Sequence, residues 1–439
     1  MPSKLKSCNK LSKYLSIKLI MKKLKLLSAI FLLAVIASCS KNNPVAPFKP
    51  ITPTGTKDVY VAGAINNIAT LWKNGAATAL NATGMHATTA VAVCVKSSNV
   101  VKSSNVYVAG NGYDASNNSF AILWINGSAT LYAKGTIANS LFVDAAGTVF
   151  VAGISTIQYQ SNSPYPYNGT QTYQAATLWT NGIAKVLTDG NKAFYDNNAL
   201  FYGGEINRNA AATCVYAGYV SGWEFQGAYG QESGTLWNNK NELVLYNSIG
   251  GNYQANEPYN GLVGHFFGGD TAYIIPPTFS LISLNQASSV FVDSTNNVYA
   301  AGYVTQGNFT AAYGQAPHSH KATLWKNGIG SRLGDSAVYA DPQSIYVSGA
   351  DVYVAGMSIS KDAKNEATLW KNGVAVALST TTSNAASVFV AGTDVYVAGI
   401  TYNGTIAVAT IWKNGIATVL TDGAQTAYAN AVFVVNDIH

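Results

Sequence analysis

Val395-Tyr396-Val397-Ala398-Gly399, followed by Ala409-Thr410-Ile411-Trp412 and the pair Asn414-Gly415, is the stretch that decides the fold. The chain spells these phrases, with small changes, seven times in the same order. The first phrase recurs at Val59–Gly63, Val106–Gly110, Val149–Gly153, Val215–Gly218, Val298–Gly302 and Val352–Gly356. The second phrase ends at Trp72, Trp124, Trp179, Trp237, Trp325 and Trp370. This spacing of 42–58 residues, with one interval of 88, indicates a repeat architecture.

Each repeat divides into four short strands, A to D in chain order, rich in the residues that favour pleated and half-buried sheets. In the last repeat the four strands are 387–390, 395–399, 409–412 and 417–420. Four-stranded units of this size are typical of propeller blades. The sequence therefore predicts an all-β fold over 57–439, a seven-bladed β-propeller with four-stranded antiparallel blades. An insertion around 246–288 accounts for the long interval.

The connection between strands C and D has the sharpest local signal. In six repeats an Asn-Gly pair follows the tryptophan strand at one offset. Both central residues of a type I′ turn need a positive φ, which Asn-Gly adopts readily, so these connections are predicted to be tight hairpins. The fourth repeat has Asn238-Asn239-Lys240-Asn241 instead, which predicts a longer connection.

The two ends of the repeat region complement each other. The chain finishes with Ala431-Val432-Phe433-Val434-Val435, a strand A with no strand B after it, whereas the first repeat starts at Lys57 with a strand B. We expect the C-terminal strand to join the first blade and close the ring. Closure removes the exposed sheet edges at which chains aggregate.

These motifs carry a family resemblance that covers roughly 57–435. Ala-Thr-Leu-Trp-x-Asn-Gly, an apolar strand and then a Gly-terminated Val-rich strand such as Asn297–Gly302 resemble the HAF-type repeats of bacterial extracellular proteins. The resemblance implies a propeller outside the cytoplasm. It implies no shared catalytic residue.

The N-terminal segment resembles the signal of a bacterial lipoprotein. The apolar run Leu26–Ala37 follows several lysines and has the length of a signal core, which is too short for a transmembrane helix. Ile36-Ala37-Ser38-Cys39 resembles a lipobox, which implies lipidation of Cys39. We expect 1–39 to be the signal peptide, with Met21 as an alternative start, and 40–56 to be a flexible tether. A secreted protein with a chance cysteine is the alternative.

The residues after Cys39 bear on location. Ser40-Lys41 contains no Asp, which by resemblance favours the outer membrane, and either its periplasmic side or the cell surface. The formal charge of +6 does not indicate nucleic-acid binding, because eight of the 26 basic residues lie in 1–38. The remaining 18 face 20 acidic residues, a net charge of −2. We expect no nucleic-acid partner and a monomer held to the membrane by its lipid.

Antiparallel blades send their connections to two ends of the ring. We call the end with the B–C and D–A connections the loop end, and the end with the A–B and C–D connections the hairpin end. The long connections are predicted at the loop end, in B–C segments at 111–120, 154–175, 219–234 and 303–321. Insertions gathered on one face of a repeat array mark a binding face, although neutral drift in loop length is the alternative.

Aromatic residues concentrate in these connections. The candidate ligand-binding residues are Trp223, Phe225, Tyr229, Tyr303, Phe309 and Tyr313. Aromatic rings pack on sugar faces and are also enriched at protein interfaces, so a glycan or an envelope protein is the expected ligand. Aromatics that merely pack on the ring are the alternative.

The sequence predicts no catalytic residue, metal site or cofactor. His318-Ser319-His320 has alternating spacing but lacks an identifiable third ligand, so solvated loop histidines are expected. Cys94, in strand A of blade two, and Cys214, assigned to strand B of blade four, are expected to be small buried side chains. The predicted function is a non-catalytic, lipid-anchored binding module. A glycan hydrolase or lyase that uses loop carboxylates, and a structural envelope protein, are the alternatives.

Overall fold

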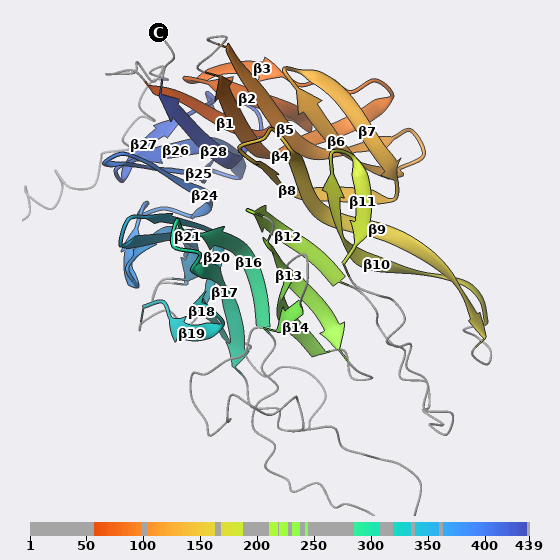
Figure 1. Cartoon of the computed structure of the whole chain (residues 1–439). Helices are drawn as coiled ribbons and strands as arrows, with labels where there is room; N and C mark the ends of the chain where they lie inside the picture. Colours follow the sequence, from red (N-terminus) through yellow and green to blue (C-terminus); the bar gives the residue numbers. More distant parts are fainter. Residues whose placement is uncertain are drawn as a thin grey trace, which may run out of the picture. The chain divides into compact units, whose positions relative to one another are not determined.

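The computed structural model describes residues 57–98, 103–162, 168–187, 210–217, 219–226, 231–237, 242–244, 285–306, 319–334, 339–359 and 363–436. This part of the chain forms seven four-stranded antiparallel sheets, which are the predicted blades (Figure 1). The proposed signal, the tether and most of the 246–288 insertion lie outside the described residues, and strand β16 begins near the end of that insertion.

The strands take the same four positions in every sheet. The innermost strands, of type A, are β28 (Ala427–Asn436), β4 (Met85–Ser98), β8 (Thr136–Val143), β12 (Ala210–Tyr216), β16 (Asn285–Val292), β20 (Ala340–Ser348) and β24 (Ser383–Ala391). Those of type B are β1 (Lys57–Ile65), β5 (Ser103–Asp114), β9 (Val149–Asn162), β13 (Tyr219–Gln226), β17 (Val298–Gln306), β21 (Asp351–Ile359) and β25 (Asp394–Asn403).

The outer half of each blade is built in the same way. Strands of type C are β2 (Ile68–Lys73), β6 (Ser119–Ile125), β10 (Asn168–Thr180), β14 (Gln231–Trp237), β18 (Ser319–Lys326), β22 (Asn365–Lys371) and β26 (Ile406–Lys413). The outermost strands, of type D, are β3 (Ala76–Ala79), β7 (Ser128–Lys134), β11 (Ile183–Val186), β15 (Glu242–Val244), β19 (Ile329–Arg332), β23 (Val374–Ala377) and β27 (Ile416–Val419).

The C-terminal strand closes the ring as predicted. β28 pairs antiparallel with β1, with Val432 opposite Val61 and Val434 opposite Val59, and so supplies the innermost strand of the first blade. Each innermost strand also contacts the innermost strands of both neighbouring blades, which completes the circle.

The Asn-Gly hairpins have the predicted geometry and one additional contact. Asn74 and Gly75 both have positive φ, 51° and 84°, and the other five pairs have the same signs. The Asn74 side-chain oxygen also accepts a hydrogen bond from the backbone N–H of Val59 at 2.8 Å, and the asparagines of the other five hairpins repeat this contact. The asparagine therefore forms the turn and also ties strand C to strand B. In blade four, four residues connect β14 to β15, in agreement with the longer connection predicted there.

A β-bulge explains the glycine that ends the B phrase in six blades. All seven A–B ladders shift register at an equivalent position, where the innermost strand has an extra residue, and the ladder of blade two has a second shift. The bulge pushes a carbonyl towards the partner strand. A Cβ added at Gly399 would lie 2.0 Å from the backbone oxygen of Asn384, and one at Gly63 would lie 1.8 Å from that of Tyr428. Only glycine fits there, although the sequence pattern alone gave no reason for it.

Blade four corrects one strand assignment. The sequence placed strand B at Val215–Gly218, whereas Ala210–Tyr216 is the innermost strand β12 and Tyr219–Gln226 is strand B. The Val-Tyr-Ala-Gly letters span an A–B turn in which Ala217 has a φ of 49°. Cys214 therefore lies in strand A.

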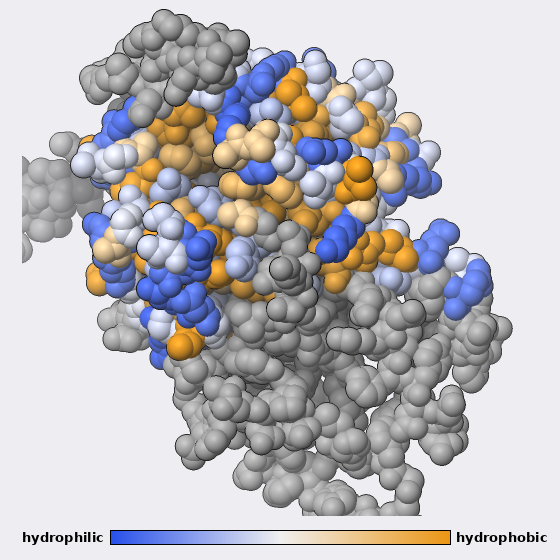
Figure 2. All heavy atoms as spheres, viewed as in Figure 1, coloured by the Kyte–Doolittle hydropathy of each residue, from blue (hydrophilic) through white to orange (hydrophobic). Residues whose placement is uncertain are grey.

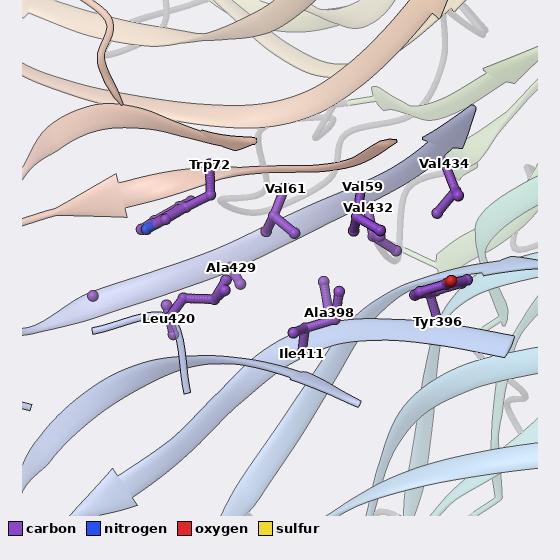
Figure 3. Close-up of a cluster of buried hydrophobic side chains, with 12 residues drawn as sticks. Val59, Val61, Trp72, Tyr396, Ala398, Ile411, Leu420, Ala429, Val432 and Val434 are labelled. Atoms are coloured by element: carbon purple, nitrogen blue, oxygen red, sulfur yellow. The ribbon is translucent and has the colours of Figure 1, made fainter. Parts of the chain in front are cut away.

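The hydrophobic core lies between neighbouring blades. Trp72 of blade one packs with Ile411 and Leu420 of blade seven, and Val432 of the closing strand joins the same cluster (Figure 3). The seven repeated tryptophans are 0–3% exposed. Because these tryptophans are buried in every blade, they are packing residues. A residue that recurs in all repeats is expected to have such a structural role.

Candidate functional site

The long connections at the loop end are mainly extensions of the strands. In blade three, β9 and β10 continue their ladder from Phe150–Thr180 outward to Asn162–Asn168, through most of the segment predicted as a loop at 154–175. In blade five, strand residues occupy both ends of the predicted 303–321 loop. A strand extension holds its side chains on a hydrogen-bonded scaffold, so the loop end is more rigid than the sequence suggested.

The predicted ligand-binding residues divide into two groups. Trp223 and Phe225 lie in strand β13, where Trp223 is opposite Ala211 and Gly234, and Tyr303 lies in β17. Tyr229, Phe309 and Tyr313 lie outside the described residues. The assignment of Trp223 and Phe225 to a B–C loop is therefore wrong, because strand B of blade four is Tyr219–Gln226 rather than Val215–Gly218, whereas strand C ends at Trp237 as predicted.

Tyr303 takes part in an aromatic stack that joins blades five and six. Its ring lies parallel to that of His320, with centroids 3.8 Å apart and an interplanar angle of 7°. Tyr339, which precedes the first strand of blade six, stacks on His320 with centroids 4.2 Å apart. The Tyr303 hydroxyl donates a hydrogen bond to the Gln286 side-chain oxygen at 2.6 Å. We call Tyr303, His320 and Tyr339 the tyrosine–histidine stack.

The sequence detected only part of this stack. His320 was expected to be a solvated loop histidine, whereas it lies in β18 and is half-buried between two rings. His318 lies outside the described residues. Tyr339 was missed because it lies in the connection between two repeats, and only the packing of blades brings it to His320.

One acidic side chain lies next to the stack. Burial, with a smaller opposing contribution from Gln343, raises the pKa of Asp341 to about 6, and Asp341 in turn raises the pKa of Tyr339. Burial and the nearby Arg332 lower the pKa of Lys321. Lys321 follows His320 in β18 and Arg332 is opposite Thr323 in β19, so both basic side chains lie on the face of blade five opposite to His320 and Tyr303. The stack thus combines half-buried aromatic rings with one adjacent acid, Asp341.

A second aromatic group lines the middle of the ring. The innermost strands of blades three to seven and one place aromatic rings side by side, each pair with centroids 4.5–5.0 Å apart: Phe142, Tyr216, Phe291, Tyr346, Phe389 and Phe433. Cys94 takes the equivalent position in blade two, opposite Tyr107 in the ladder. Burial raises the pKa of the Cys94 thiol to about 11, so it is a poor nucleophile and acts as a small packing residue.

Serines on the innermost strands connect the blades. The hydroxyl oxygens of Ser140, Ser289, Ser344 and Ser387 each accept a hydrogen bond from a backbone N–H of the next blade at 3.1–3.2 Å. Cys214 takes this position in blade four, with its sulfur 3.7 Å from the hydroxyls of Ser140 and Ser289. Both cysteines therefore replace a member of a repeated structural set.

The described residues contain no group of three or more His, Cys, Asp or Glu side chains arranged to hold a metal ion. Within the same residues, no helix is long and apolar enough to cross a membrane. The geometry offers aromatic surface and charge at the loop end.

These features define the class of the protein, a seven-bladed β-propeller closed by its C-terminal strand. No family model and no curated protein matches the chain. Among solved structures, it is similar to the β-propeller domain of the Trilobed protease from Pyrococcus furiosus, which is described as having an open velcro topology. The two share 8% identity over 73% of this chain and 82% of that chain, with a TM-score of 0.32. A likeness this weak carries no argument about function.

Proposed function

We propose that the protein is a lipid-anchored propeller of the bacterial outer membrane that binds a glycan or an envelope protein at its loop end, without catalysis. The observation that carries the binding role is the tyrosine–histidine stack with Asp341 beside it. Aromatic rings supply flat apolar contact area at a small cost in side-chain entropy, and the adjacent carboxyl group supplies orientation. The lipobox-like Ile36-Ala37-Ser38-Cys39 supports the anchor.

A glycan hydrolase is less well supported. Such enzymes need two carboxyl groups across the scissile bond, one of them with a raised pKa. Asp341 has the raised pKa that such an acid needs. Burial rather than a neighbouring carboxylate raises this pKa, so Asp341 does not indicate a pair of carboxyl groups. The loop acids Glu224 and Glu232 lie in strands β13 and β14, opposite Ser233 and Phe225 respectively in that ladder.

The binding role is tested with the purified full-length protein in detergent. It is applied to a glycan array and, in parallel, used for pulldown from an envelope extract. We expect Tyr303→Ala and Tyr339→Ala to weaken binding at least tenfold, while Lys371→Ala at the hairpin end leaves binding unchanged. Trp223→Ala tests the remaining sequence prediction in blade four. Binding that survives all three aromatic changes and fails with Lys371→Ala places the working face at the hairpin end. Absence of any ligand in both screens supports the structural alternative.

The anchor is tested separately. Cys39→Ala is expected to move the protein from the membrane fraction to the soluble fraction. Unchanged membrane association, together with mass spectrometry that finds no lipid on Cys39, contradicts the anchor and leaves the binding test unaffected.

A further inference from the structure

Four consecutive blades have a common sequence at the C–D hairpin. In blades five, six, seven and one, a lysine precedes the Asn-Gly pair and a small or branched aliphatic residue follows it, as in Lys371-Asn372-Gly373-Val374. The corresponding pairs of ends are Lys326 with Ile329, Lys413 with Ile416, and Lys73 with Ala76. In blades two and three, Ile125 and Thr180 replace the lysine. The lysine tips therefore form one continuous arc of the hairpin end.

The aliphatic residues of this arc are among the most exposed large hydrophobic side chains in the described residues. Ile329 is 72% exposed, Val374 is 68% and Ile416 is 74%. Over the visible face of the ring, hydrophobic residues reach the surface at separate places among hydrophilic ones (Figure 2). A single exposed isoleucine needs no explanation, but three at equivalent tips of adjacent blades, each next to a lysine, form a repeated surface feature.

The lysine side chains at these tips are partly exposed, and each contacts residues of strand B. Lys73, Lys371 and Lys413 pair with the aspartate at or near the start of strand B, with N–O distances of 2.7–3.0 Å. In each pair the lysine side chain is more exposed than the aspartate side chain, 52% against 16% in blade one and 42% against 21% in blade seven. The lysine also lies over the ring of the tyrosine in strand B, with the nitrogen 5.1–5.5 Å from the ring centroid in all four blades. The lysine is therefore the more accessible member of each pair.

The tether reaches the propeller at the same arc. Strand β1 begins at Lys57, whose amine lies 3.3 Å from Asp394 of blade seven. Residues 40–56 separate this point from Cys39. If these residues form the flexible tether that the sequence predicts, their root-mean-square span is roughly 20–25 Å. A lipid on Cys39 therefore keeps the hairpin end, rather than the loop end, close to the bilayer on average.

We propose that the hairpin tips of blades five, six, seven and one rest on the lipid bilayer, with Ile329, Val374 and Ile416 in the headgroup region. The inference rests on the proposed lipid anchor. Exposed aliphatic side chains gain by entering the interface, and lysines beside them place their amines among lipid phosphates. The tether makes this contact intramolecular, so weak individual contacts are sufficient. The loop end then faces away from the membrane, towards its ligand.

The test measures the depth of single labelled sites in the lipidated full-length protein. The protein is reconstituted in phosphatidylethanolamine–phosphatidylglycerol vesicles, in a background with Cys94→Ala and Cys214→Ser. An environment-sensitive fluorophore is attached through Val374→Cys, Ile416→Cys or, as the matched control, Tyr402→Cys. Tyr402 is 41% exposed at the loop end of the same blade as Ile416. Spin-labelled lipids in the vesicles then quench fluorophores at the membrane surface.

We expect quenching at 374 and 416 to exceed that at 402 at least threefold. We also expect Ile329→Ser to reduce the quenching at 374, since it removes a neighbouring tip. Equal quenching at all three positions, or stronger quenching at 402, overturns the proposed orientation. Vesicles that carry the protein without quenching at any position overturn the contact but retain the anchor. Protein that does not float with the vesicles overturns both the anchor and the orientation that rests on it.

Discussion

Lys57 and Asp394 are 337 residues apart in the sequence, and their side chains form an ion pair across the junction of the ring, with Nζ 3.3 Å from Oδ2. The Lys57 amine also donates a hydrogen bond to the carbonyl oxygen of Ala391 at 2.8 Å. Asp394 further accepts hydrogen bonds from Asn414 and pairs with Lys413. Blade one, which contains both ends of the repeat region, is thus fastened to blade seven by charge as well as by packing.

The first prediction concerns the pH dependence of this junction. Hydrogen bonds from Asn414 and Lys413, and the contact with Lys57, hold the pKa of Asp394 below its usual value of 3.8. A lowered folded-state pKa adds stability above the unfolded value, and this stability is lost as the pH falls through the folded-state value. Asp394→Asn should therefore lower the free energy of unfolding between pH 5 and 8, by less than about 1 kcal/mol because both side chains are partly exposed to solvent. The difference from the wild type should shrink below about pH 4. A difference independent of pH contradicts the ionic role.

The second prediction concerns closure. Removal of 431–439 deletes most of β28, including Val432 and Val434, which are 4% and 5% exposed. At roughly 1.5–3 kcal/mol for each large buried side chain, the loss should reach several kcal/mol, because the edge of β1 is also uncovered. Urea denaturation measures this loss of unfolding free energy. Removal of 437–439 alone, beyond the end of β28, is the control and should have little effect. An unchanged midpoint after the longer deletion contradicts closure by this strand.

The repeat pattern predicted the architecture because its signals are local and recur. Tryptophan strands, Asn-Gly turns and the unpaired last strand each specify one element, and all of them agree with the seven sheets. Blade four misled the assignment because its Val-Tyr-Ala-Gly letters cover a turn. In the other six blades the corresponding phrase lies in strand B. A pattern of four letters cannot separate the two cases without the pairing of strands.

The candidate site was less predictable than the fold. Tyr303 was found because it lies beside a long connection, whereas its partners His320 and Tyr339 come from another strand and from the next blade. The aromatic side chains that line the middle of the ring also make their contacts between blades, as Phe389 does with Phe433. Such contacts join residues of different repeats, so comparison of repeats does not reveal them.

The third prediction tests the bulge that requires glycine. Because a Cβ at Gly399 would lie 2.0 Å from the Asn384 oxygen, Gly399→Ala must displace backbone in the innermost ladder. We expect the free energy of unfolding to fall by about 1–3 kcal/mol, the range for overpacked cores. Gly404→Ala is the matched control in the same blade. Its Cβ would meet nothing within 4 Å, so only the strain of a φ of 61° remains, about 1–2 kcal/mol. A control that is more destabilised than Gly399→Ala contradicts the steric argument.

The fourth prediction has the opposite pH sign to the first. Burial raises the pKa of Asp341 from 3.8 to about 6, so the folded protein binds the proton more tightly than the unfolded chain does. Stability should therefore fall as the pH rises from about 4 to 6, and above pH 6 the full cost of a buried carboxylate remains. Asp341→Asn removes this cost. It should stabilise the protein at pH 7 by about 1–3 kcal/mol, since one pKa unit corresponds to about 1.4 kcal/mol.

The measurement for Asp341 is a series of denaturation curves from pH 3 to 8 for the wild type, Asp341→Asn and Asp394→Asn. The gain from Asp341→Asn should vanish below about pH 4, where the wild-type carboxyl is neutral in both states. Asp394→Asn is the internal control, because its deficit should persist at pH 7 and also fade in acid. A stabilising effect of Asp341→Asn that is the same at pH 3 and pH 7 would show that shape or hydrogen bonding, rather than the buried charge, sets the cost of this aspartate at the loop end.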